Sequence, residues 1–238
     1  MKCLFLAAGY ATRLYPLTEN FPKPLLPIKK GVPLLDYFIN DLEEIGCIDE
    51  YIVVSNHKFT HFFEEWSKTH SQKITIVDDG TTTNENRLGA VKDIQLVINN
   101  LNINEDLLVL AGDNLLDFSL KEFIIFFKEK NNSCVMRYFE SNLNKIKKSA
   151  NLIIDEDDKI IKMLEKPETP ESNWCCPPFY LYKKEDLKLI DKCIKETTYF
   201  DSPGAFASFV AKNSTLYAFL MNGKRIDVGT LEDYLKLK

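Results

Sequence analysis

The chain has 238 residues, of which 45% are hydrophobic, enough to build one large or two small globular domains and too many for a disordered protein. Its 30 Lys and Arg against 35 Asp and Glu give a net charge of -5, which argues against nucleic acid or an anionic membrane as a partner. No segment approaches the roughly eighteen apolar residues of a membrane span, and the N-terminal apolar run lacks a signal-peptide cleavage site, so we expect a cytoplasmic protein.

Apolar runs alternate with helical patterns over the first two thirds of the chain. Nearly unbroken apolar runs, typical of parallel strands covered on both faces, predict strands at residues 2–8, 51–55, 73–77 and 107–111. Apolar residues at i, i+3 and i+4 predict helices between them, at residues 33–45, 60–69, 87–99 and 120–130. This alternation indicates βαβ units around a parallel sheet.

The remaining part of the chain predicts a mixed or antiparallel extension of that sheet. Strands with little helix between them are predicted at residues 134–139, 150–155, 159–164 and 174–182. They are followed by helices at 183–195, 204–212 and 231–237 and by strands at 215–221 and 224–228. Because no repeat, low-complexity tract or linker interrupts the chain, we expect a single domain over residues 1–238.

The cysteines and histidines give no sign of a structural metal site. The six cysteines stand mostly in apolar stretches, and Cys175 and Cys176 are adjacent instead of spaced as a zinc-ligand pair, so free buried thiols are expected. His57 and His61 have i, i+4 spacing, but HKFTH lacks the glutamate of HExxH, which favours solvated histidines.

The loop after the first predicted strand has the composition of a phosphate-binding segment. In open α/β sheets, ligands gather beyond the carboxyl ends of the strands, and residues 8–27 form the first such loop. Gly9 is expected to allow a tight turn with free amide groups, while Arg13 and Lys23 supply positive charge and four prolines stiffen the loop. GYATRL lacks two glycines of the dinucleotide fingerprint, and no Walker A loop occurs in the chain.

Four ordered motifs carry a resemblance to a known family. LAAGYATRLYPLTENFPKPLLPI, at residues 6–28, resembles the signature of the sugar-1-phosphate nucleotidyltransferases, typically LAAGxGTRLxPLTxxxPKPLLPI. The one departure is Ala11, where the family often has glycine. AGDN at 111–114, LEKP at 164–167 and RIDVGTLEDY at 225–234 continue the resemblance in order, so it covers nearly the whole chain.

The resemblance implies both a fold and a reaction. The fold would be an α/β, Rossmann-like three-layer α/β/α sandwich with a mixed, mainly parallel central sheet, the nucleotide-diphospho-sugar transferase fold. The reaction would transfer a nucleotidyl group from a nucleoside triphosphate to a phosphorylated small molecule with release of pyrophosphate, in nucleotide-sugar biosynthesis. Self-association into a homo-oligomer stays open. As the chain ends at Lys238, we expect no C-terminal β-helix or acetyltransferase domain of the kind found in larger relatives.

Two aspartates are candidates for holding a magnesium ion. Asp113 follows a strand and Gly112, and Asp227 ends another short strand before Gly229. Two carboxylates together with phosphate oxygens suit Mg²⁺, a hard ion that keeps several waters. The alternative is that each aspartate only caps a turn or a helix.

The resemblance also implies roles for individual residues. Arg13 would contact the triphosphate and stabilise departing pyrophosphate, Lys23 would contact the α-phosphate and the acceptor phosphate, Lys166 the acceptor phosphate, and Glu165 the acceptor hydroxyls. Ordinary surface charges are the alternative for each of these residues. The nucleotide would contact Ala8, Gly9, Thr12, Arg13, Asn84, Gly89 and Asp113.

The acceptor and the base are less defined. EKP and the C-terminal motif favour a hexose 1-phosphate, whereas bacterial-type phosphocholine cytidylyltransferases share the N-terminal loop. Trp174, Phe179 and Tyr180 are candidates to stack on a sugar, with core packing as the alternative. A non-catalytic nucleotide-sugar sensor is the reading from another class. A glycosyltransferase would need a D-x-D motif, and AGDNLLD lacks it.

Overall fold

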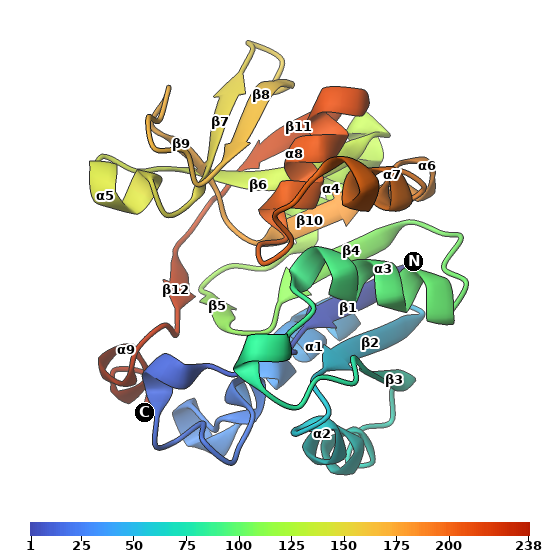
Figure 1. The fold of residues 1–238 in the computed structure, drawn as a ribbon, viewed down its shortest axis with the longest axis vertical. Helices are drawn as coiled ribbons and strands as arrows, with labels where there is room; N and C mark the ends of the chain where they lie inside the picture. Colours follow the sequence, from blue (N-terminus) through green and yellow to red (C-terminus); the bar gives the residue numbers. More distant parts are fainter. The chain divides into compact units, whose positions relative to one another are not determined.

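The candidate phosphate-binding loop, residues 8–27, follows the first of three parallel strands. In the computed structural model, which describes all residues from 1 to 238, β1 (Lys2–Leu6) pairs in parallel with β2 (Glu50–Ser55), and β2 pairs in parallel with β3 (Ile74–Asp78) (Figure 1). Every residue of β2 is buried, as its apolar composition predicts. The helices α1 (Leu34–Ile45) and α2 (Thr60–Ser67) make the two crossovers, so the predicted βαβ units are confirmed.

The chain folds as two compact units, each drawn from separate stretches of sequence. The first unit comprises Met1–Leu88, Leu110–Lys121 and Gly223–Lys238. The second comprises Gly89–Val109 and Glu122–Asn222. The expectation that residues 1–238 form a single domain is not tested by this division and stays a prediction.

The C-terminal segment completes the first unit. β12 (Arg225–Asp227) pairs antiparallel with β5 (Asn114–Leu116), and α9 (Leu231–Leu235) follows. The hydroxyl of Tyr234 donates a hydrogen bond of 2.8 Å to the carbonyl of Pro27. Residues of this segment share one apolar cluster with the loop after β1, namely Leu14, Leu26, Ile28, Leu34, Leu115, Val228, Tyr234 and Leu237. The phosphate-loop candidate is therefore held by residues from the far end of the sequence.

The second unit is built around β6 (Ser133–Phe139), which pairs antiparallel with β9 (Trp174–Cys176) and β10 (Phe179–Tyr182) and parallel with β11 (Leu216–Leu220). β7 (Ala150–Ile154) pairs antiparallel with β8 (Ile160–Glu165) and with β9. These pairings confirm the mixed or antiparallel strands predicted for this part of the chain, and the EKP motif begins at the end of β8.

The other elements of the chain are mainly helices. They are α3 (Ala90–Asn100), α4 (Lys121–Lys130), α5 (Leu143–Ile146), α6 (Lys184–Leu187), α7 (Ile190–Glu196), α8 (Gly204–Asn213) and the strand β4 (Leu107–Ala111). No helix in the structure is both long enough and apolar enough to cross a lipid bilayer.

Several predicted boundaries are wrong, for local physical reasons. The strand predicted at 174–182 is two strands, because Pro177 and Pro178 cannot donate to a ladder and separate β9 from β10. The helix predicted from residue 87 begins only at Ala90, since Gly89 has φ +89°. The helix predicted at 183–195 is two short helices, α6 and α7. The short elements β5 and α5 were not predicted.

Candidate functional site

In the loop after β1, the residue with left-handed backbone conformation is Ala11 and not Gly9. Ala11 has φ 48° and ψ 40°, in the left-handed region that favours glycine, whereas Gly9 is outside that region. The Ala11 carbonyl accepts hydrogen bonds from the Leu14 amide at 2.9 Å and from the Thr18 hydroxyl at 2.8 Å. Gly9 therefore does not use the left-handed conformation that favours glycine. Instead, a side chain added at Gly9 would meet no atom within 4 Å, so this glycine leaves open space beside the backbone.

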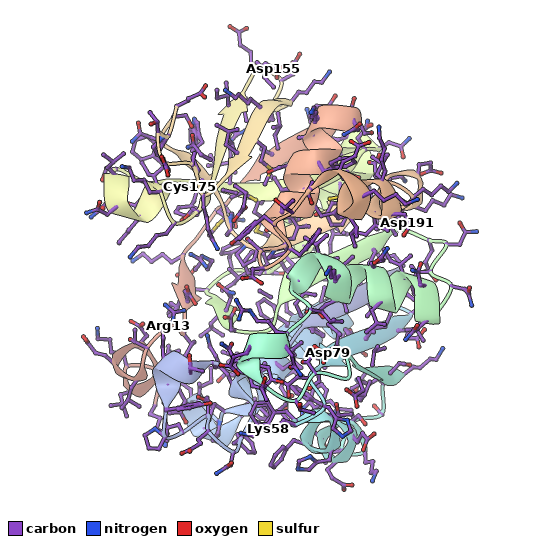
Figure 2. All side chains as sticks on the ribbon, in the orientation of Figure 1. Arg13, Lys58, Asp79, Asp155, Cys175 and Asp191 are labelled. Carbon is purple, nitrogen blue, oxygen red and sulfur yellow. The ribbon has the colours of Figure 1, made fainter.

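The other loop residues that are predicted to contact the nucleotide differ in their exposure to solvent. Ala8 is buried, and its carbonyl accepts a hydrogen bond of 2.9 Å from the Asn56 side chain. Thr12 and Arg13 are exposed in a 3-10 turn, and Figure 2 labels Arg13 there. The Arg13 guanidinium is thus available to an anion in solution.

Lys23 is a buried lysine with a carboxylate partner. It stands between Pro22 and Pro24 in a 3-10 turn and is only 5% exposed. Its ammonium donates a hydrogen bond of 2.9 Å to Oδ2 of Asp113. The alternative of an ordinary solvated lysine is wrong here, because a lysine is rarely buried without a partner for its charge.

Asp113 lies close to Lys23 because the backbone at Gly112 packs closely against the loop after β1. The Gly112 amide donates to the Leu6 carbonyl at 3.1 Å, which ties the end of β4 to the end of β1. A Cβ at Gly112 would lie 3.3 Å from both the Leu6 carbonyl and the Pro24 ring. Glycine thus allows the backbone carrying Asp113 to approach the loop that carries Lys23.

Asp227 joins the same cluster from the C-terminal segment. It lies opposite Asn114 in the β5–β12 ladder, and the Val228 amide donates to the Asp113 carbonyl at 3.2 Å. Partial burial and the carboxylate of Asp113 raise the pKa of Asp227, while Lys23, Arg225 and Arg13 oppose that shift. The predicted residues Arg13, Lys23, Asp113 and Asp227 are therefore brought together in the first unit.

This pair of carboxylates fits a hard divalent cation. The negative charge of Asp113 acts on Asp227, and a positive ion bound beside the two carboxylates would relieve that repulsion. No cluster of three or more His, Cys, Asp and Glu side chains in the chain is arranged to hold a metal ion, so other ligands would have to be water or substrate phosphates. Mg²⁺ binds in that manner, through one or two carboxylates and phosphate oxygens.

Asn114 and Arg225 belong to the cluster although sequence reasoning assigned them no role. The Asn114 amide donates to Oδ1 of Asp113 at 2.6 Å, and its oxygen accepts from the Arg225 guanidinium at 2.7 Å. Asn114 is 1% exposed, so its orientation is fixed. Both residues stand inside the AGDN and RIDVGT motifs, which is the signal that could have identified them.

The predicted base-contacting residues lie in short, defined turns. Asn84 begins a 3-10 turn in the first unit, and its carbonyl accepts a hydrogen bond of 2.7 Å from the Arg87 side chain. Gly89, in the second unit, precedes α3, and a Cβ there would lie 2.7 Å from the Phe200 carbonyl oxygen. Glycine is therefore required at position 89 by space as well as by backbone conformation.

The predicted acceptor residues, Glu165 and Lys166, stand together at the end of β8 in the second unit. Glu165 accepts a hydrogen bond of 2.6 Å from the Ser202 hydroxyl, and burial raises its pKa. Lys166 is exposed and has φ 45°, and its ammonium donates to the Tyr199 hydroxyl at 3.0 Å. Ser202 and Tyr199 were not singled out from the sequence.

The aromatic residues expected to stack on a sugar divide between core and surface. Phe179 is fully buried and Tyr180 is 2% exposed, so neither side chain can stack on a ligand. For both residues the alternative interpretation, packing in the core, is the correct one. Trp174 is half-buried and packs edge-on against Phe139, with the Arg137 guanidinium 5.0 Å from its ring centroid.

Comparison with known proteins identifies the family. The model of the nucleotidyl transferase family matches residues 2–238. The chain belongs to the nucleotidyl transferase family. Its α/β fold is shared with a UDP-glucose pyrophosphorylase solved in complex with UDP-glucose, at 24% identity and a TM-score of 0.81, over 99% of this chain and 96% of that one. The expected fold class is confirmed.

Curated relatives are longer proteins. The chain is 27% identical to the bifunctional protein GlmU of Methanocaldococcus jannaschii, over 99% of this chain and 53% of that protein. It is 24% identical to the glucose-1-phosphate adenylyltransferase of Clostridium novyi, over 98% of this chain and 64% of that protein. The chain thus spans about half to two thirds of the length of these relatives.

Proposed function

We propose that this protein transfers a nucleotidyl group from a nucleoside triphosphate to a sugar 1-phosphate and releases pyrophosphate, giving a nucleoside diphosphate sugar. The observation that carries the proposal is the cluster of Lys23, Asp113 and Asp227 beside the loop that follows β1. Membership of the nucleotidyl transferase family and relatives named for sugar 1-phosphates support it. Because nucleoside triphosphates are made inside the cell, we also propose a cytoplasmic location.

The proposed roles follow from the charges of the cluster. Arg13 and Lys23 neutralise the triphosphate and stabilise the charge that moves onto the departing pyrophosphate. Asp113 and Asp227 would hold Mg²⁺, which supplies charge neutralisation and fixes the orientation of phosphate oxygens. Ala8, Gly9, Thr12, Asn84 and Gly89 are proposed to contact the nucleotide.

The acceptor is proposed to bind through Glu165 and Lys166. The Lys166 ammonium would hold the acceptor phosphate, and the Glu165 carboxylate would accept hydrogen bonds from sugar hydroxyls. The attacking oxygen belongs to a phosphate monoester whose second pKa is about 6, so it is already largely ionised at neutral pH. The protein therefore needs no general base and acts by positioning and charge neutralisation.

A matrix of pyrophosphate release tests the proposal. We would combine ATP, UTP, dTTP, CTP and GTP with glucose 1-phosphate, mannose 1-phosphate or phosphocholine, with Mg²⁺ or with EDTA. We expect release with at least one hexose 1-phosphate and none with EDTA. Release only with phosphocholine would overturn the acceptor, and no release despite binding of a nucleotide sugar would indicate a sensor.

The aspartate variants test the metal assignment within the same assay. Asp113→Asn is expected to remain folded and to lose nearly all turnover, because it removes a charged ligand. Asp157→Asn, which removes an exposed carboxylate in the turn between β7 and β8, is the matched control and should keep wild-type turnover. Near-normal pyrophosphate release by Asp113→Asn would overturn the role of that residue.

A further inference from the structure

The connection between α7 and α8 contacts both predicted acceptor residues. Residues 199–204, referred to below as the 199–204 segment, lead from α7 into the first residue of α8, Gly204. They lie in the same unit as the EKP motif. Three of the segment's residues touch Glu165 or Lys166, and a fourth ties the segment to the start of α3.

The contact to Lys166 comes from Tyr199. The Tyr199 hydroxyl accepts the hydrogen bond of 3.0 Å from the Lys166 ammonium, which also lies 5.6 Å from the centroid of the tyrosine ring. The backbone of Lys166 is held as well, since its amide donates to the Ser149 carbonyl at 3.2 Å. A lysine side chain has many rotamers, and these contacts select one of them.

The contact to Glu165 comes from Ser202 and Gly204. The Ser202 hydroxyl donates to Oε1 of Glu165 at 2.6 Å. A Cβ at Gly204 would lie 2.0 Å from Oε2 of the same carboxylate, so only glycine leaves room for it there. One carboxylate oxygen is thus held by a hydroxyl, and the other fits against the first turn of α8.

The segment is fixed at its centre by Phe200. The Phe200 carbonyl accepts a hydrogen bond of 3.0 Å from the Val91 amide at the start of α3. The Lys92 ammonium lies 4.6 Å from the centroid of the Phe200 ring. The groups presented to Glu165 and Lys166 therefore come from an anchored backbone.

We infer that the 199–204 segment sets the acceptor site, with Ser202 positioning the carboxylate of Glu165 and Tyr199 positioning the ammonium of Lys166 for a sugar phosphate. The inference rests on the proposed function. Ser202 and Tyr199 act through the two acceptor residues and are positioning residues. Their removal should weaken use of the acceptor and leave use of the triphosphate unchanged.

Steady-state kinetics of Ser202→Ala, Ser202→Thr and Tyr199→Phe test this inference. The acceptor is glucose 1-phosphate, replaced by mannose 1-phosphate or phosphocholine if the wild type prefers one of them. A hydrogen bond to a charged group is strong enough that its loss should raise the acceptor KM roughly tenfold in Ser202→Ala, with the triphosphate KM within about twofold of wild type. Ser202→Thr keeps a hydroxyl and should restore most of the loss. Tyr199→Phe should raise the acceptor KM by about threefold.

The control is Thr198→Ala, which removes an exposed hydroxyl next to the segment and should change neither KM. An unchanged acceptor KM in both Ser202→Ala and Tyr199→Phe would overturn the inference, as would an equal rise in the triphosphate KM. Tyr199 is 41% exposed, so its variant tests the inference even if Ser202→Ala does not fold. A wild-type protein that releases no pyrophosphate would instead overturn the proposed function.

Discussion

The ammonium of Lys23, which is 5% exposed, donates a hydrogen bond of 2.9 Å to the carboxylate of Asp113. The same ammonium also lowers the pKa of Asp227 against the effects of burial and of Asp113. Lys23 is thus hydrogen-bonded to one of the two carboxylates and acts on the charge of the other, together with Arg225 and Arg13. A metal ion bound to the carboxylates would compete with the ammonium of Lys23.

Lys23→Met should therefore separate metal binding from turnover. Two charges about 4 Å apart interact by about 1 kcal/mol even in water, so removal of the ammonium should tighten Mn²⁺ binding to the nucleotide-free protein by at least about fivefold. Turnover should fall by at least about 10²-fold, because an electrostatic stabiliser is lost. Electron paramagnetic resonance of Mn²⁺ measures the first effect, with the exposed Lys29→Met as control. Weaker Mn²⁺ binding by Lys23→Met would contradict this account.

Ala11→Gly should stabilise the protein. The left-handed conformation costs a non-glycine residue about 1–2 kcal/mol, and the greater freedom of glycine in the unfolded chain returns about 0.4–1 kcal/mol of that. We expect a gain of about 0.5–1 kcal/mol in the free energy of unfolding by urea. Ala211→Gly, in the helix α8, should lose about the same amount. A loss of stability in Ala11→Gly would count against the described turn.

Gly89→Ala should be more harmful than the same change at another left-handed glycine. The new Cβ would lie 2.7 Å from the Phe200 carbonyl oxygen, so steric overlap adds to backbone strain for a total of about 2–4 kcal/mol. Gly46→Ala, with φ +67° and its nearest neighbour at 3.9 Å, should cost only about 1–2 kcal/mol. Equal losses in urea unfolding would show that the overlap with Phe200 is relieved at no cost.

Glu165→Gln should gain stability relative to the wild type as the pH rises. Burial raises the pKa of Glu165 in the folded protein above its unfolded value of about 4.3. The folded protein then keeps the proton longer, so the wild type loses stability as pH increases through that interval, and glutamine does not. Urea unfolding at several pH values from about 4 to 7 measures the difference, with the exposed Glu168→Gln as control. An advantage that shrinks with rising pH would refute the prediction.

Only one of the six thiols should react rapidly in the native protein. Cys47 is partly exposed, whereas the other five cysteines are buried. Burial also raises the pKa of Cys134 to about 12, which suppresses its thiolate. A coloured disulfide reagent should therefore titrate about one thiol in native buffer and all six in urea, and Cys47→Ser should abolish the fast phase. Two or more fast thiols in the wild type would be inconsistent with the described packing.

Much of the fold follows from local patterns. The apolar runs predict β1 and β2 because both faces of these strands are covered, and the i, i+3, i+4 spacing predicts α1 from Leu34, Leu35 and Phe38. The break at Pro177 and Pro178 has a local cause in the sequence, because proline has no amide hydrogen to donate to a strand ladder. The β5–β12 pair could not be predicted, because three-residue strands acquire their pairing only from partners distant in sequence.

The site was predictable to the extent that motifs mark it. Lys23, Asp113 and Asp227 each belong to a sequence motif, and the structure brings them together. Asp113 and Asp227 stand at the ends of strands, and ligands of α/β sheets bind beyond the carboxyl ends of strands. Ser202 and Tyr199 stand in no motif, and a hydroxyl in a loop has no pattern that names its partner. Their contacts depend on where the chain between α7 and α8 runs, which is a tertiary property.

The return of β12 and α9 to the first unit also sets an order of events during synthesis. The loop after β1 is synthesised well before Asp227 and the apolar partners Val228, Tyr234 and Leu237. At about 5–20 residues per second, the loop after β1 would wait for these partners for on the order of ten seconds or more. Until then the apolar residues Leu14, Leu26 and Ile28 lack the partners Val228, Tyr234 and Leu237 that bury them in the folded protein.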